Sequence, residues 1–193
     1  MAPKLIIPGI TDEATLACIA RSRKYSQYVK AVENALTGVC PFCHIDRSYN
    51  NVVAENDFWY AWPCKPPEDN TRLHFLFVPK RHVKDSEELS DEEILALFGK
   101  FGIRRAVRGT YAYTSRGMLM RDGDATLSAG TIQHLHIHDM VPAGTGRVES
   151  PFYKGAQAEA ESLARAIVFE RIRQGVTEKD LTAEELMLTV GRL

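Results

Sequence analysis

Residues 133–142 read QHLHIHDMVP. This segment contains half of the six histidines in the chain, His134, His136 and His138, at every second position. Because side chains alternate between the two faces of a β-strand, this spacing puts the three imidazoles on one face and the intervening leucine and isoleucine on the other. An α-helix would scatter the same residues around its circumference. The pattern therefore predicts a strand with one apolar face and one imidazole face.

The three imidazoles cannot easily bind one metal ion together. Two strand residues at i and i+2 have Cβ atoms roughly 7 Å apart and can share a zinc ion. The outer pair is separated by about 13 Å along the strand, whereas Zn–N bonds are only about 2.0–2.1 Å long. At least one histidine therefore remains, and a neutral imidazole near neutral pH is a nucleophile or a proton carrier.

Length and composition indicate a compact protein whose cysteines are reduced thiols. A chain of 193 residues forms one domain of ordinary size, or one domain with extensions. A net charge of −1 argues against a general nucleic-acid binder with a basic surface. Apolar runs are too short for a membrane span or a signal peptide. Four cysteines, two of them in a CxxC pair, indicate thiols and a metal rather than disulfides, so we expect a cytoplasmic protein.

Runs of strands with helices to one side predict an α+β fold with an antiparallel sheet. The strands are expected at 51–55, 57–63, 73–79, 117–121 and 132–141. The helices are expected at 12–36, 90–108, 155–174 and 183–192. On the helix at 90–108 we expect five inward-facing residues: Ile94, Leu95, Leu97, Phe98 and Phe101.

The sequence CPFC at 40–43 supplies two sulfurs for a tetrahedral zinc ion, which needs two further ligands. Donor chemistry alone leaves five candidates for these ligands: His44, Cys64, His74, His82 and His134. Cys64 with His74 is one conceivable pair. The other interpretation of CPFC is a pair of inert thiols in a turn.

Several segments together resemble the histidine-triad (HIT) family. The HLHIH core resembles its motif of three histidines alternating with hydrophobic residues. The segments that precede it follow the usual HIT order: CPFCHI at 40–45, AENDFWYAWP at 54–63, LHFLFVPKRHV at 73–83, then MRDGD and SAGTIQ. The resemblance covers roughly residues 38–145, about half of the chain.

The resemblance implies a HIT-like fold, in which helices pack on an antiparallel sheet. It places a catalytic domain at 38–154, with additional helical extensions at 1–37 and 155–193. Many HIT proteins with such a CxxC bind a structural zinc through the histidine of a P-K-x-H segment and the first triad histidine. The zinc ligands implied here are Cys40, Cys43, His82 and His134.

The resemblance also implies a mechanism and its residues. The middle histidine, His136, attacks the α-phosphorus of a nucleotide, and His138 assists as a proton donor. Thr131 matches a family position that contacts phosphate, and Gln133 and Arg121 are further candidates for substrate binding. Arg121 stands near a position that is often asparagine, which leaves the ribose-phosphate contacts open.

The implied activity is nucleotidyl hydrolysis or transfer on a nucleoside phosphate, such as a dinucleoside polyphosphate or a nucleoside phosphoramidate. His138 favours hydrolysis, because the transferases commonly have glutamine there. HIT proteins are typically homodimers. The alternative is a catalytically idle nucleotide-binding or scaffolding protein, because Asp139 replaces an apolar family residue and the ends, about 1–37 and 155–193, lie outside the resemblance. By alternation Asp139 faces the apolar side, so we expect the strand to end, or to reach an interface, at this residue.

Overall fold

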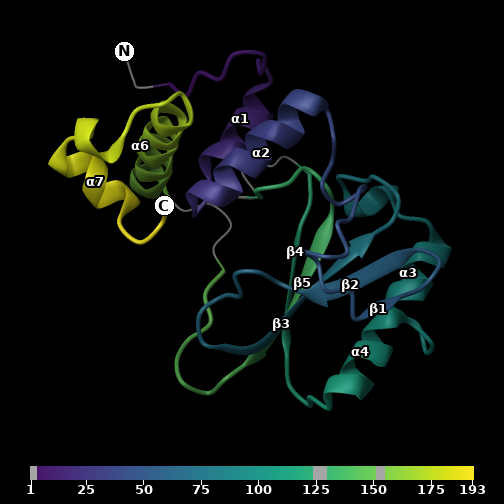
Figure 1. Ribbon diagram of the computed structural model, residues 1–193. Helices are drawn as coiled ribbons and strands as arrows, with labels where there is room; N and C mark the ends of the chain where they lie inside the picture. The colour runs from purple at the N-terminus through teal and green to yellow at the C-terminus, as the bar shows by residue number, and fades with distance from the viewer. Residues whose placement is uncertain (1–3, 124–129, 151–154) are drawn as a thin grey trace. The chain divides into compact units, whose positions relative to one another are not determined.

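The computed structural model describes residues 4–123, 130–150 and 155–193. The chain forms two compact units, whose elements are labelled in Figure 1. The helical unit contains Met1–Cys40, Asp124–Gln133 and Phe152–Leu193, and the sheet unit contains Pro41–Gly123 and His134–Pro151. The expected domain boundaries after residues 37 and 154 stay predictions, and the second adjoins 151–154, which lie outside the described residues.

The sheet unit is built on five antiparallel strands. They are β1 (Ala54–Glu55), β2 (Trp59–Pro63), β3 (Thr71–Pro79), β4 (Gly117–Arg121) and β5 (His136–Pro142). Their order in the sheet is β1-β2-β3-β5-β4, so β5 lies between β3 and β4. The predicted α+β fold with an antiparallel sheet is confirmed. Among the described residues, no helix has the length and apolar character needed to cross a membrane.

Two helices of the sheet unit replace the single helix that was expected at 90–108. α3 (Asp91–Phe98) begins with a capping box between Ser90 and Glu93, and α4 (Ile103–Tyr111) follows it. Between them Gly99 has extended backbone torsions, and a Cβ atom there would lie 2.4 Å from the carbonyl oxygen of Leu95. A side chain at residue 99 would collide with the last turn of the helix, so only glycine fits where the chain leaves it. The helix therefore ends at Gly99.

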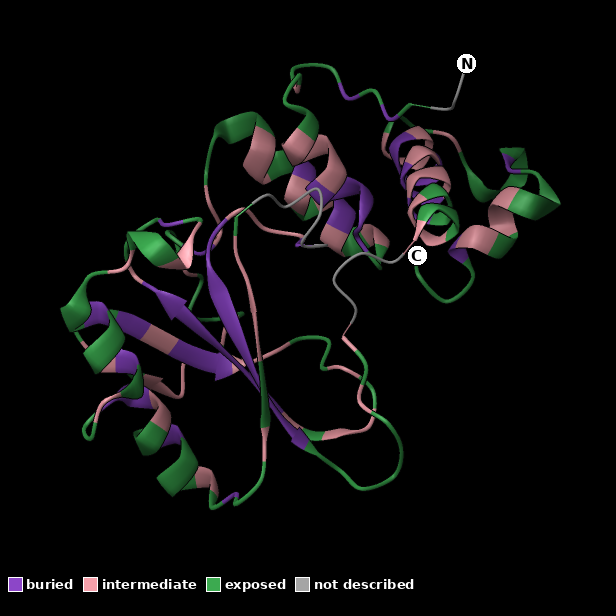
Figure 2. Ribbon diagram, turned by 180° about the vertical axis from the view of Figure 1, so that it is seen from behind, coloured by how far each residue is buried: buried purple, intermediate pink, exposed green. Residues whose placement is uncertain are grey.

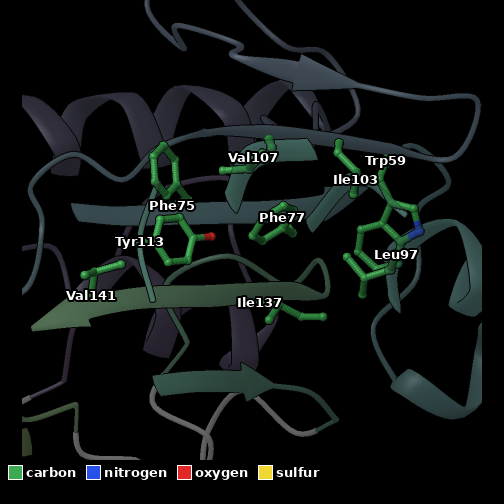
Figure 3. Packing of buried hydrophobic residues seen from close by; sticks show 10 residues of the cluster. Trp59, Phe75, Phe77, Leu97, Ile103, Val107, Tyr113, Ile137 and Val141 are labelled. Carbon is green, nitrogen blue, oxygen red and sulfur yellow. The ribbon is translucent and has the colours of Figure 1, made fainter. Parts of the chain in front are cut away.

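The prediction of which residues of this helix face inwards is mostly wrong. Leu97 is buried, but Leu95 is 65% exposed and Phe101, in the loop between α3 and α4, is 92% exposed. The break after α3 moves Phe101 off the helix on which the apolar spacing had placed it. The core of the sheet unit is shown in Figure 3, and its residues include Trp59, Phe75, Phe77, Leu97, Ile103, Val107, Tyr113, Ile137 and Val141.

The helical unit contains α1 (Glu13–Ala20), α2 (Tyr25–Thr37), α6 (Ala156–Arg173) and α7 (Ala183–Thr189). The expected helix at 12–36 is interrupted, because the amide of Arg21 bonds to the carbonyl of Cys18 and so closes the last turn of α1 tightly. Its expected end is confirmed, since Gly38 adopts a left-handed conformation after α2. Tyr28 and Phe169 are at the centre of its core.

β5 is buried along almost its whole length (Figure 2). The strand begins at His136 rather than at residue 132, so His134 precedes it. Asp139 does not end the strand, which continues to Pro142. Its side chain is 0% exposed and accepts a hydrogen bond of 2.7 Å from the hydroxyl of Tyr113, which explains how a carboxyl group is accommodated on the apolar face.

Candidate active site and metal centre

His136 and His138 lie on the face of β5 opposite to the core residue Ile137. Strand alternation produces this arrangement, and their ring centroids are 5.0 Å apart. Both side chains are buried, so each imidazole depends on protein groups as hydrogen-bond partners. These partners determine which nitrogen of each ring carries a proton.

The His136 imidazole is held by the backbone of its own segment. Its Nδ1 lies 2.8 Å from the carbonyl oxygen of His134, so Nδ1 carries the proton and donates it. Burial lowers the pKa of His136 below the usual histidine value, and the positive charge of Arg121 adds to this effect, while the His134 carbonyl acts in the opposite direction. The ring is therefore neutral near pH 7, with the lone pair on Nε2.

Arg121 is placed beside His136 by the register of the sheet. It is the last residue of β4, and its Cα is paired with that of His136. Directly opposed residues of an antiparallel pair project from the same face, so the guanidinium group belongs to the imidazole face of the sheet. One of its nitrogens, Nη2, donates a hydrogen bond of 2.9 Å to the Ser150 hydroxyl.

His138 contacts a residue that was not expected to take part in the site. The amide of Glu68 donates to Nδ1 of His74 over 2.9 Å, which leaves the proton of that neutral ring on Nε2. His74 Nε2 lies 2.8 Å from His138 Nδ1 and donates to it. His138 therefore carries its own proton on Nε2. Sequence periodicity could place His74 on a strand, but the pairing depends on the register between β3 and β5.

Four potential zinc ligands come together at the CPFC turn. One donor atom from each of Cys40, Cys43, His82 and His134 lies within 4.8 Å of the others. Cys43 Sγ is 3.3 Å from His82 Nδ1 and 3.6 Å from His134 Nδ1. The edge of a zinc tetrahedron between sulfur and nitrogen ligands is about 3.6 Å, from Zn–S bonds of about 2.3 Å and Zn–N bonds of about 2.0–2.1 Å. The residues present therefore fit zinc.

His134 is oriented for this role by a second contact. Its Nε2 donates to the carbonyl of Pro79 over 3.0 Å, which directs the unprotonated Nδ1 towards the Cys43 sulfur. Burial lowers the pKa of His134 to about 4, partly opposed by the Pro79 carbonyl. The ring is thus in the neutral form that a metal ligand requires.

The competing ligand pair, Cys64 with His74, lies elsewhere. These two residues group with His138, within 4.8 Å of one another, and not with the CPFC cysteines. Phe42, inside the CPFC turn, connects the metal centre to the nucleophile candidate. Its ring packs edge-on against His134 and His136, with centroid distances of 5.7 and 5.4 Å.

The remaining two site candidates belong to a segment grouped with the helical unit. Thr131 and Gln133 are both half-buried, and the Gln133 amide donates to the Thr15 hydroxyl over 3.3 Å. The structure therefore brings together Arg121, His136 and His138 in the sheet unit. The roles of Thr131 and Gln133 in substrate binding stay predictions.

Comparisons with known proteins find similar folds only among solved structures. No family model and no curated protein matches the chain. A member of the HIT family from Bacillus subtilis is 22% identical, covering 72% of this chain and 98% of its own, with a TM-score of 0.46. A HIT family protein from Bacillus anthracis is 24% identical, covering 72% and 97%, with a TM-score of 0.45. A Zn-bound histidine triad family protein from Mycobacterium smegmatis is 22% identical, covering 71% and 97%, with a TM-score of 0.42.

Proposed function

We propose that this chain is a nucleotidyl hydrolase or transferase of the HIT type, which acts through a covalent nucleotidyl-histidine. The observation that carries the proposal is the state of His136: a buried, neutral ring whose Nδ1 proton is held by the His134 carbonyl. A neutral nucleophile is not repelled by the negative oxygens around phosphorus. The fixed tautomer presents the Nε2 lone pair, which attacks the α-phosphorus.

His138 stabilises the leaving group by a hydrogen bond. The hydrogen bonds from Glu68 to His74 and from His74 to His138 leave a proton on His138 Nε2. As the bond between the α-phosphorus and the leaving group breaks, this N–H donates a hydrogen bond to the departing oxygen or nitrogen, which takes up its proton from water. Water then cleaves the phosphorus–nitrogen bond to His136 and releases a nucleoside monophosphate. We assign phosphate contacts to Arg121, Thr131 and Gln133, and dinucleoside polyphosphates or nucleoside phosphoramidates as substrates.

Zinc, held by Cys40, Cys43, His82 and His134, supplies structure rather than reaction chemistry in this proposal. If Nδ1 of His134 coordinates the metal while Nε2 donates a hydrogen bond to the Pro79 carbonyl, neither nitrogen can contact a substrate. The backbone carbonyl of His134 accepts a hydrogen bond from His136 Nδ1. Holding His134 in place therefore also fixes the orientation of the His136 ring.

We also propose a cytoplasmic homodimer. The cysteine usage supports the compartment, and exposed apolar side chains on and after α3, among them Leu95 and Phe101, support self-association. An idle nucleotide-binding scaffold is the second candidate. Asp139 no longer favours it, because this residue is accommodated by Tyr113 on the face of β5 away from the histidines.

The proposal is tested by incubating the purified chain with dinucleoside polyphosphates and nucleoside phosphoramidates and measuring nucleoside monophosphate by chromatography. We expect release by the parent protein and none by His136→Asn, which still binds the substrate. Binding of these compounds by the parent without any release would support the idle scaffold instead.

A further inference from the structure

A basic pocket lies on the face of the sheet unit that the proposed chemistry does not use. Its volume is about 650 Å³, within the range of small-molecule sites, and α4 and the loop that follows it form its walls. Four arginines line it together with Tyr113 and Phe98: Arg104, Arg105, Arg108 and Arg116. None of the described residues that line it is acidic.

Asp139 provides the only carboxylate that the structure places against these arginines among the described residues. Arg116 Nε lies 3.5 Å from Asp139 Oδ1, and the Tyr113 hydroxyl occupies Oδ2. Asp139 alternates with His138 on β5, so the pocket and the histidines are on opposite faces of the same strand. One buried carboxylate balances only one of the four positive charges.

Two guanidinium nitrogens in this pocket are buried without a hydrogen-bond acceptor in the described part of the chain. They are Nε of Arg104 and Nη1 of Arg116. Arg104 stacks on the Phe98 ring, with its guanidinium carbon 4.6 Å from the ring centroid, so its position is fixed by packing. Burial lowers the pKa of Arg104, and the charge of Arg116 lowers it further. A buried donor without an acceptor and a repelled charge are both costly. An anion in the pocket relieves the repulsion between the guanidinium groups, and a small rotation of each group gives the buried donors an acceptor.

Arg104 and Arg108 are one helical turn apart on α4, where like charges destabilise a helix. Arg108 is held by the carbonyl of Tyr113, to which its Nε donates over 3.0 Å. Two arginines are therefore fixed by packing or hydrogen bonds and a third by an ion pair, before any ligand arrives. Such preorganised guanidinium groups match the paired oxygens of phosphate groups.

We propose that this pocket is a binding site for a phosphate-bearing small molecule, with Arg104 and Arg116 as its principal ligand-binding residues and Asp139 as the residue that positions Arg116. The site is independent of the proposed nucleotidyl chemistry, because it lies on the other face of β5. Its ligand class is set by charge: two or more linked phosphate groups are needed to balance the remaining guanidinium charges.

The test is isothermal titration and thermal unfolding of the full chain with inorganic pyrophosphate as the probe. The variant Arg104→Met keeps the packing on Phe98 but removes the charge. We expect it to weaken pyrophosphate binding by about 10- to 100-fold, the loss typical of a charge-assisted hydrogen bond. Without ligand, Arg104→Met should unfold at a higher temperature than the parent, because it removes an unsatisfied buried charge; a merely structural arginine would shift it downwards.

Two controls separate this site from others. Arg121→Gln affects the candidate active site, and Arg72→Gln removes an exposed arginine on β3; both should leave pyrophosphate binding in the pocket unchanged. The proposal is overturned if the parent does not bind pyrophosphate, if Arg104→Met binds it as tightly as the parent, or if only Arg121→Gln loses binding. Binding of RNA in place of pyrophosphate would likewise overturn it.

Discussion

At the scale of single residues, three chemically identical side chains have three different environments within five positions. His134 directs Nδ1 towards the Cys43 sulfur and donates a hydrogen bond from Nε2 to the Pro79 carbonyl. His136 donates a hydrogen bond from Nδ1 to a backbone carbonyl and has its lone pair on Nε2. His138 accepts a hydrogen bond from His74 at Nδ1 and carries its own proton on Nε2. The three roles that we propose, metal ligand, nucleophile and hydrogen-bond donor to the leaving group, therefore follow from the partners of each ring.

The lowered pKa of His136 predicts the pH dependence of the reaction. A histidine of usual pKa, about 6.5, would become protonated and inactive as the pH falls through that value. Because burial lowers the pKa of His136, its neutral form persists below this range, and kcat/KM should stay constant through pH 6.5 and decrease only at lower pH. Phe42→Ala exposes the His136 ring to solvent and should shift the acidic limb of the kcat/KM profile to higher pH. An acidic limb at or above pH 6.5 in the parent protein would contradict the assignment.

At the scale of elements, the CPFC turn connects metal binding to the site. Cys40→Ser removes one of four ligands, so the zinc content should fall from near one equivalent per chain and the midpoint of thermal unfolding should fall with it. Cys18→Ala, which removes a cysteine outside both histidine clusters, serves as the control and should retain the metal. A Cys40→Ser protein with unchanged zinc and unchanged stability would remove the site from consideration.

Glu170 on helix α6 predicts how the stability of the protein depends on pH. This carboxylate is buried, which by itself raises its pKa, but hydrogen bonds from Arg173, Tyr28 and Gln174 outweigh burial and lower the pKa below the usual value. Its contribution to stability is therefore complete above about pH 4.3 and is lost as the pH falls through the lowered pKa.

Glu170→Gln should lower the free energy of unfolding by about 1–3 kcal/mol at pH 7, because the buried hydroxyl of Tyr28 and the half-buried Arg173 lose a charged acceptor. The cost should decrease in acid, where the parent loses the same interaction. Glu161→Gln, at an exposed position of α6, should be neutral at both pH values. Urea unfolding at pH 7 and pH 3 measures the free energy of unfolding of both variants. Equal losses for Glu170→Gln and Glu161→Gln would refute the role of Glu170.

Local patterns predicted the elements well where the signal is itself local. The period of two in β5 depends on neighbouring residues and is confirmed. The capping box before α3 and the glycine after α2 are signals of the same local kind. The break at Gly99 depends on a close approach within the folded chain, which apolar spacing does not contain. The contact between His74 and His138 and the partner of Asp139 depend on register and on a distant tyrosine, so no single segment predicts them.

At the scale of the whole molecule, the apolar surface around α3 predicts self-association. The mass of the protein in solution should be about twice the 21.6 kDa of one chain at micromolar concentrations. Leu95→Asp places a charge on the exposed face of α3 and should shift the equilibrium towards the monomer without unfolding the chain. Light scattering measures both, and a parent protein with the mass of one chain at these concentrations would exclude the homodimer.

Trapping the adduct tests whether His136 forms a covalent bond to phosphorus. The protein is mixed with a labelled nucleotide substrate, quenched with acid within the first turnover, digested, and mapped by mass spectrometry. We predict a nucleotidyl group on His136 in the parent protein, and neither an adduct nor turnover in His136→Asn. An adduct on another residue, or full turnover by His136→Asn, would contradict the account.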